Sequence, residues 1–118
     1  MMSGLSVSGT WRRTKYGSVR TTRDGTCFAS KAEADYYGRL KMLEKSGEVS
    51  QVVLQPSYPV IINGIKVFTY RADFSFYDVH DQRFRVVDVK GYDTPISKLK
   101  RKCVKAMYDI DVEVVRSS

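Results

Sequence analysis

The sequence predicts one α/β domain with a mixed sheet, in which an N-terminal β-hairpin precedes the order α, β, β, β, α, β. Three observations support this fold class: two apolar stripes with helical spacing, several runs that alternate apolar and polar residues, and strong turn signals between them. The chain has 118 residues, which is enough for one domain with its own core. We expect a flexible basic arm over residues 1–13 and a single domain over residues 14–118.

The first predicted elements are a hairpin and a helix. Two short β-type runs within residues 16–28 flank Asp24-Gly25, which is a typical hairpin turn. A helix is expected from Ser30 to about residue 46, with Gly47 as its stop. Glu33 falls on the flank of its apolar stripe. That stripe is predicted to consist of Ala29, Ala32, Tyr36, Leu40 and Leu43.

Three strands are predicted next. Residues 52–62 and a strand that begins at Ile65 are joined by Asn63-Gly64, and the prolines of the first run suggest an irregular or edge strand. The second strand is expected to continue to Tyr77, and a loop over residues 78–82 leads into a third strand over 83–90. The alternation of the second strand places Tyr70, Ala72, Phe74 and Phe76 on one face and Arg71, Asp73, Ser75 and Tyr77 on the other.

A second helix and a last strand complete the predicted order. Thr94 is expected to cap a helix that has Pro95 in its first turn and that ends near Met107. A final strand follows over residues 110–114, where apolar and acidic residues alternate. The helix is predicted to direct Ile96, Leu99, Cys103 and Met107 inward and Lys98, Arg101, Lys102 and Lys105 outward.

The positive charge is concentrated in two segments of the chain, whose formal net charge is +7. Residues 1–25 hold five bases and one acid, residues 94–105 hold five bases and no acid, and the rest holds ten bases and twelve acids. Basic segments on both sides of a mildly acidic middle suggest a bound polyanion, although lysine-rich helix faces are often only solvated surface. No apolar run is long enough to cross a membrane, so we expect a cytoplasmic protein.

The segment from Val86 to Gly91 is the sharpest local feature. Its apolar residues predict a core strand, yet Asp88 and Lys90 lie on one face of that strand. Burying a charged group costs several kcal/mol unless the charge is paired or binds a metal. If this strand pairs with the preceding one, Asp73 and Asp88 converge at one end of the sheet. Two close carboxylates favour a cation between them, and oxygen ligands without a His or Cys cluster favour Mg²⁺ or Mn²⁺. Lys90 could orient a metal-bound water or help to deprotonate it.

Each of these acids also has a structural alternative. Asp88 and Lys90 could form a surface ion pair on an edge strand. Asp73 could cap a turn or pair with Arg71. Glu33 completes the pattern Ser30-x-x-Glu33, and a capping box alone would explain a glutamate there.

Together these residues resemble the PD-(D/E)XK nuclease superfamily, which has a Glu on the first helix, an Asp at the start of a strand and D-x-K on the next strand. More closely, the chain resembles the phage and prophage family DUF1064, of unknown function, over residues 15 to about 115. The stretches that carry this resemblance are Lys15-Tyr16-Gly17, Asp24-Gly25, Phe28-x-Ser30-Lys31-x-Glu33-Ala34, Leu54-Gln55-Pro56, Tyr70-x-Ala72-Asp73-Phe74 and Asp88-Val89-Lys90-Gly91.

The resemblance implies a restriction-endonuclease-like α-β-β-β-α-β core and assigns roles to single residues. It implies that Asp73, Asp88 and the Val89 carbonyl bind the catalytic metal, that Glu33 completes the site, and that Lys90 handles the attacking water. Gln55 is implied as a residue that lines the site or supports it from behind. The sequence departs from the superfamily pattern in having Ala72 in place of the proline that names it, and Asp88 where many members have Glu.

We therefore expect a Mg²⁺-dependent DNA endonuclease, with Mn²⁺ able to substitute. By analogy with small resolvases of the superfamily, it would act on branched DNA, such as Holliday junctions, as a homodimer in phage recombination or replication. The residues expected to hold flanking DNA phosphates are Arg12, Arg13, Lys15, Arg20, Lys98, Arg101, Lys102 and Lys105. The alternatives are a phage nucleic-acid-binding module without catalysis, and a nickase or RNA-directed nuclease of the same fold.

Overall fold

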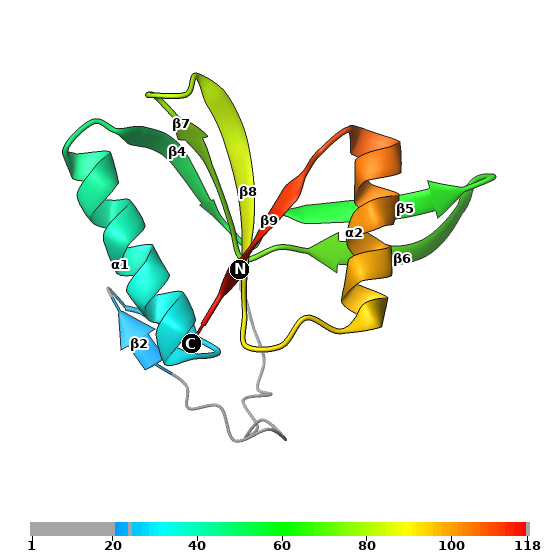
Figure 1. Ribbon diagram of the computed structural model, residues 1–118, viewed down its shortest axis with the longest axis horizontal. Helices are drawn as coiled ribbons and strands as arrows, with labels where there is room; N and C mark the ends of the chain where they lie inside the picture. The colour runs from blue at the N-terminus through cyan, green and yellow to red at the C-terminus, as the bar shows by residue number, and fades with distance from the viewer. Residues whose placement is uncertain (1–20, 24, 118) are drawn as a thin grey trace. The chain divides into compact units, whose positions relative to one another are not determined.

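The computed structural model describes residues 21–23 and 25–117 (Figure 1). These residues fall into two compact parts, one up to Asp35 and one from Tyr36 onward, and each is described by itself. The first part contains the antiparallel pair β2 (Thr21–Arg23) and β3 (Thr26–Phe28). Gly25 adopts a positive φ of 77° in the turn, as a tight hairpin requires. The predicted hairpin is thus confirmed over these residues, whereas residues 16–20 and the predicted boundary after residue 13 lie outside the described chain.

Helix α1 (Lys31–Lys45) begins and ends where the sequence predicts. The Ser30 hydroxyl accepts a hydrogen bond of 3.2 Å from the Glu33 N–H, and Gly47 ends the helix at a φ of 83°. The predicted apolar stripe is only partly right, because Ala29 is exposed while Ala34, Tyr37 and Leu40 are buried. The buried face is broader than the stripe because the adjacent rings of Tyr36 and Tyr37 both stack on Phe74, with centroids 5.5 and 6.3 Å away.

A four-stranded sheet forms the centre of the second part. It consists of β4 (Val49–Leu54), β7 (Phe74–Asp78), β8 (Arg83–Lys90) and β9 (Val112–Arg116), in the order β4-β7-β8-β9. The first three strands are antiparallel, and β9 lies parallel to β8 after a crossover through α2 (Pro95–Tyr108) (Figure 1). This mixed sheet with its two helices confirms the predicted fold class and the α-β-β-β-α-β core order.

The strands between α1 and β8 differ from the prediction. The chain leaves the main sheet after β4, forms a separate hairpin of β5 (Ser57–Ile62) and β6 (Ile65–Arg71), and returns to the sheet in β7. The predicted strands over residues 52–62 and 65–77 are therefore each two strands in different sheets. The breaks fall at Gln55-Pro56, where Gln55 has a φ of 53°, and at Ala72-Asp73.

Two main-chain hydrogen bonds hold these two breaks together. The Gln55 N–H donates to the Asp73 carbonyl at 2.9 Å, and the Ala72 N–H donates to the Pro56 carbonyl at 3.0 Å. Tyr70, Ala72, Phe74 and Phe76 are nevertheless all buried, as the alternation predicts. The period of two continues through the break, so it could not reveal that the chain changes sheets.

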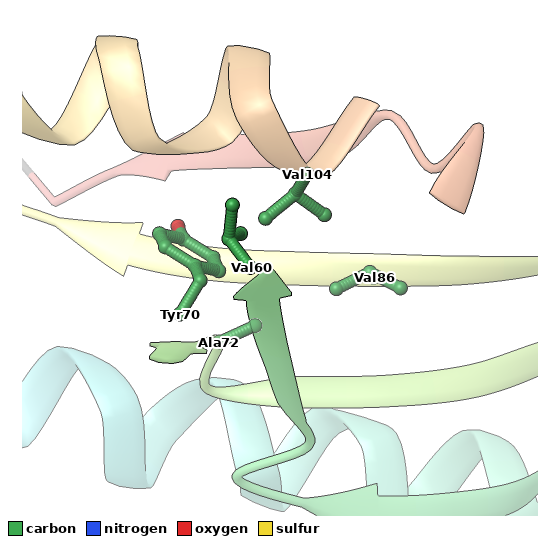
Figure 2. Close-up of a cluster of buried hydrophobic side chains, with 5 residues drawn as sticks. All are labelled: Val60, Tyr70, Ala72, Val86 and Val104. Atoms are coloured by element: carbon green, nitrogen blue, oxygen red, sulfur yellow. The ribbon is translucent and has the colours of Figure 1, made fainter. Parts of the chain in front are cut away.

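Helix α2 packs against β8 and the β5–β6 hairpin through a cluster of buried residues, which are Val60, Tyr70, Ala72, Val86 and Val104 (Figure 2). The Thr94 hydroxyl accepts a hydrogen bond of 3.1 Å from the Ser97 N–H, which confirms the predicted cap and start. The predicted inward face is wrong for Ile96, Leu99 and Met107, which are 57%, 56% and 44% exposed, and right for Cys103, which packs against the cluster.

The inward face of α2 is instead partly polar. Val104 is fully buried, but Lys100 lies over the Phe68 ring and the Arg101 guanidinium pairs with Asp93. This face of the helix therefore carries charged side chains with specific partners as well as Val104. Within the described ranges, no helix is long and apolar enough to cross a membrane.

Candidate metal centre

The pairing of β7 with β8 places Asp73 beside Asp88. In the register Phe74 lies opposite Val87, and the Asp73 N–H donates to the Val87 carbonyl at 3.1 Å, so the next pair outward is Asp73 and Asp88. The Asp73 Oδ2 atom then accepts a hydrogen bond of 2.7 Å from the Val89 N–H. Asp73 therefore folds over the end of β8 instead of serving only as a turn cap or as a partner of Arg71.

Asp88 is a buried carboxylate on an interior strand. It is 4% exposed, and β8 lies between β7 and β9, which excludes a surface ion pair on an edge strand. Two groups contact its Oδ2 atom: the Tyr70 hydroxyl donates a hydrogen bond to it, and the Lys90 Nζ atom lies 3.4 Å away. Within residues 21–23 and 25–117, no group donates a hydrogen bond to Oδ1. A buried carboxylate oxygen without a donor is costly, and a bound cation would compensate it.

Tyr70 is a component of the site that the sequence reasoning missed. It lies on β6, 18 positions from Asp88, and its ring belongs to the buried cluster. Burial and the Asp88 carboxylate raise the pKa of Tyr70 far above its ordinary value, so its hydroxyl stays protonated and can donate. The signal was present only as the first residue of Tyr70-x-Ala72-Asp73, where an alternating strand explains a tyrosine equally well.

The Val89 peptide group faces the same end of the sheet as Asp73. The N–H and C=O of one strand residue point toward the same neighbouring strand, and the Val89 N–H points to Asp73. The Val89 carbonyl is therefore directed past the start of β7, toward Asp73. By contrast, the Lys90 carbonyl faces β9, where it accepts a hydrogen bond of 3.0 Å from the Ser117 N–H.

These donors fit a hard divalent cation. The Asp73 carboxylate, Asp88 Oδ1 and the Val89 carbonyl offer oxygen atoms, which are the donors that Mg²⁺ and Mn²⁺ prefer. No group of three or more His, Cys, Asp or Glu side chains lies close enough to bind a metal in the described part of the chain. If the two carboxylates and the carbonyl held Mg²⁺, water and substrate oxygens would occupy its other coordination positions, as is common for this ion.

Lys90 lies next to the carboxylate pair without being fully solvated. Its side chain is 21% exposed, compared with 6% for that of Asp88. Both side chains leave β8 on the same face because they are two residues apart. An ammonium group in this position can stabilise negative charge that develops on a neighbouring phosphate.

Comparisons with known proteins identify the family. The family model described as a protein of unknown function (DUF1064) matches residues 13–118. The chain belongs to the DUF1064 family. No curated protein and no solved structure matches it.

Two further predicted site residues of this DUF1064 protein have different surroundings. Gln55 lies beside Asp73 through the main-chain bond described above, with an exposed side chain. Glu33 lies in the first turn of α1, where its N–H takes part in the capping interaction with Ser30. It belongs to the first compact part, whereas Asp73 and Asp88 belong to the second, so a role for Glu33 in the site stays a prediction.

The basic residues of α2 do not form the uniform surface that was predicted. The Arg101 guanidinium donates two hydrogen bonds to Asp93, at 2.9 and 2.5 Å, and its side chain is only 13% exposed, so its predicted outward orientation is wrong. Lys105 faces outward but lies 2.9 Å from Asp109 and 3.1 Å from Asp111. Lys98 and Lys102 are exposed as predicted. The four bases predicted in the arm and hairpin, Arg12, Arg13, Lys15 and Arg20, lie outside the described residues.

Proposed function

We propose that this DUF1064 protein is a metal-dependent DNA endonuclease of the PD-(D/E)XK type. The observation that supports this proposal is the pairing of Asp73 with Asp88 at one end of β7 and β8, next to the Val89 peptide and Lys90. An acid pair, an adjacent carbonyl and a lysine on two neighbouring core strands form a set of groups suited to phosphodiester hydrolysis.

The residues divide between holding the cation and acting on the substrate. Asp73, Asp88 and the Val89 carbonyl would hold Mg²⁺, or Mn²⁺ in its place, and Glu33 would complete the site. A bound Mg²⁺ would polarise a phosphate oxygen and lower the pKa of a water molecule. Lys90 would orient the attacking water and stabilise charge on the phosphate, while Lys98 and Lys102 would contact phosphates on either side.

The preferred substrate of the proposed enzyme is branched DNA, such as a four-way junction. We expect DNA shape, and not base sequence, to determine where it cuts. A homodimer would place two such centres on the two strands of a junction.

Substitution of the paired acids tests the proposal. We expect Asp73→Asn and Asp88→Asn each to reduce the Mg²⁺-dependent cleavage of a four-way junction by about 10²-fold or more, because each removes a ligand charge while it keeps the size of the side chain. The matched control is Asp111→Asn, which changes an exposed aspartate on the approach to β9. Cleavage is measured as a single-turnover rate on labelled oligonucleotides, with protein in excess.

The outcomes separate the candidate functions. Wild-type cleavage that is unaffected by both substitutions would show that the site is elsewhere. DNA binding without cleavage in Mg²⁺ or Mn²⁺ would instead support the non-catalytic binding module. Matched linear, nicked and ribonucleotide substrates then distinguish a resolvase from a nickase or an RNA-directed nuclease, because equal cutting of junction and linear duplex contradicts branch selectivity.

A further inference from the structure

We propose that Tyr70 is a positioning residue for the metal centre, whose hydroxyl holds one oxygen of Asp88 so that the other oxygen is presented to the cation. This inference rests on the proposed function, because it concerns the geometry of one of the proposed ligands. Tyr70 itself touches neither the cation nor the substrate.

The two carboxylate oxygens of Asp88 have different surroundings. Both of its contacts, from the Tyr70 hydroxyl and from the Lys90 ammonium, are made by Oδ2. Among the described residues, none donates a hydrogen bond to Oδ1 or forms an ion pair with it, although Asp88 is only 4% exposed. A carboxylate on a β-strand can rotate about its terminal torsion, which is broad and roughly two-fold. A partner that is fixed to one oxygen removes this freedom and selects a single-oxygen ligand.

Tyr70 is well placed to act as such a fixed partner. It is 5% exposed, and Figure 2 shows its ring beside Val60 in the cluster between α2 and the main sheet. The ring therefore cannot change rotamer without disturbing the buried cluster. The hydroxyl reaches Asp88 from a strand of the separate β5–β6 hairpin, so Tyr70 and Asp88 belong to different sheets.

A charged pair lies next to the Tyr70 hydroxyl. Arg101 on α2 interacts with the Tyr70 hydroxyl, and the same guanidinium forms a two-pronged ion pair with Asp93 just before the helix. The planar guanidinium is suited to this arrangement, because it can bind a carboxylate through two nitrogens and direct a further N–H elsewhere. Tyr70 on β6 thus contacts the Asp88 oxygen directly, and Arg101 on α2 acts on that oxygen only through the Tyr70 hydroxyl.

Partners of this kind affect metal affinity without binding the metal. Hydrogen bonds to ligating side chains orient the ligands, and their removal typically costs about 10–100-fold in metal affinity or activity. The burial of Asp88 adds to this effect, because a free carboxylate oxygen in an apolar setting has few other groups that can fix it.

The test is the substitution Tyr70→Phe, which removes the hydroxyl and keeps the ring in the cluster. The matched control is Tyr108→Phe, since Tyr108 packs against the same cluster but its hydroxyl donates to the Pro59 carbonyl, at 2.6 Å, and not to Asp88. We expect Tyr70→Phe to weaken Mn²⁺ binding to the DNA-free, full-length protein by about 10-fold or more, measured by calorimetric titration. We expect Tyr108→Phe to bind Mn²⁺ as the wild type does.

Thermal unfolding without metal accompanies the titration and detects a purely structural effect. Two results overturn the inference alone: wild-type Mn²⁺ affinity in Tyr70→Phe, or an equal loss of affinity in both variants. If the wild-type protein binds no Mn²⁺ that depends on Asp88, the proposed function fails and this inference fails with it. The two failures are thus distinguishable by the behaviour of the wild type and of Asp88→Asn.

Discussion

At the scale of single residues, the buried Asp88 carboxylate has partners among the described residues on only one of its two oxygens, and Lys90 is one of these partners. The Oδ2 atom has two partners and Oδ1 has none in the described chain, while the Lys90 ammonium remains partly exposed at 3.4 Å. Lys90 can therefore serve either to neutralise Asp88 or to act on a substrate phosphate. The difference is measurable, because a neutralising lysine affects folding and metal binding, whereas a reacting lysine affects the rate of cleavage.

The substitution Lys90→Ala tests which of these roles dominates. We expect it to lower the single-turnover cleavage rate at saturating junction DNA by about 10²-fold or more, because it removes a positioned cation from the reacting phosphate. We expect the affinity for DNA to change little, since one partly buried lysine contributes little to the phosphate grip. The matched change Lys98→Ala should lower the affinity for DNA and leave the cleavage rate at saturation nearly unchanged. A loss of binding with an unchanged rate at saturation would contradict the role of Lys90 in catalysis.

At the scale of the elements, the candidate site depends on a chain path that the sequence did not reveal. The positions of α1, α2, β8 and the β2–β3 turn could be predicted, because caps, glycines and prolines act locally. The two breaks beside Asp73 could not, because burial keeps its period of two from Tyr70 to Phe76 while the chain passes from one sheet to another. The pairing of Asp73 with Asp88 survives this error, since it requires only that β7 and β8 form a hairpin.

The predicted orientation of α2 was wrong for a related reason. Its apolar positions at helical spacing predict an inward stripe, but the structure directs Lys100, Arg101 and Val104 toward the sheet and the β5–β6 hairpin. The partners that reverse the expectation are distant in the sequence or lie outside the helix, namely Phe68, Tyr70 and Asp93. The spacing of apolar residues indicates which face of a helix is apolar, but it does not indicate which arginine forms an ion pair with an acid outside the helix.

The pairing of β8 with β9 is reinforced by a charge network that predicts how stability depends on pH. Arg85 on β8 donates to both carboxylate oxygens of Glu113 on β9, at 2.8 and 2.6 Å. These hydrogen bonds from Arg85 hold the pKa of Glu113 below its ordinary value of 4.5. A lowered pKa means that the stabilisation is present above the ordinary value and is lost as the pH falls through the folded value.

We therefore expect the free energy of unfolding of the wild type to fall as the pH is lowered from 7 to below 4.5. Glu113→Gln should be less stable than the wild type at pH 7 and should lose less stability on acidification, because one titrating group has been removed. The pKa values of Asp78 and Asp93 are lowered too, chiefly by hydrogen bonds, so part of the pH dependence should remain. Urea unfolding at several pH values measures this difference, and identical pH dependence in both proteins would show that the Arg85 pair does not contribute.

At the scale of the whole molecule, the net charge of +7 overstates the surface available to a polyanion. Residues 94–105 contain no acid, yet acids just outside this window pair with two of its five bases: Asp93 with Arg101, and Asp109 and Asp111 with Lys105. Lys100 lies over the Phe68 ring, which leaves Lys98 and Lys102 as the exposed bases of α2 that form no direct ion pair in the described chain. Charge counted along the sequence therefore has to be corrected for pairing before it indicates a binding surface.

The salt dependence of DNA binding tests this corrected surface. The logarithm of the association constant falls linearly with the logarithm of the salt concentration, with a slope of about −0.9 per phosphate contact on duplex DNA. We expect Lys98→Ala combined with Lys102→Ala to reduce the magnitude of the slope by about 2, because each lysine displaces counterions from one phosphate. Lys105→Ala is the matched control on the same helix, and it should reduce the slope by less because Asp109 and Asp111 already neutralise that ammonium.

Fluorescence anisotropy with a labelled junction, at a series of salt concentrations and without divalent metal, gives the slopes. If the slope is unchanged in the double variant but falls in Lys105→Ala, the phosphate contacts of α2 lie at its C-terminal end, and pairing with an acid does not exclude a lysine from binding DNA.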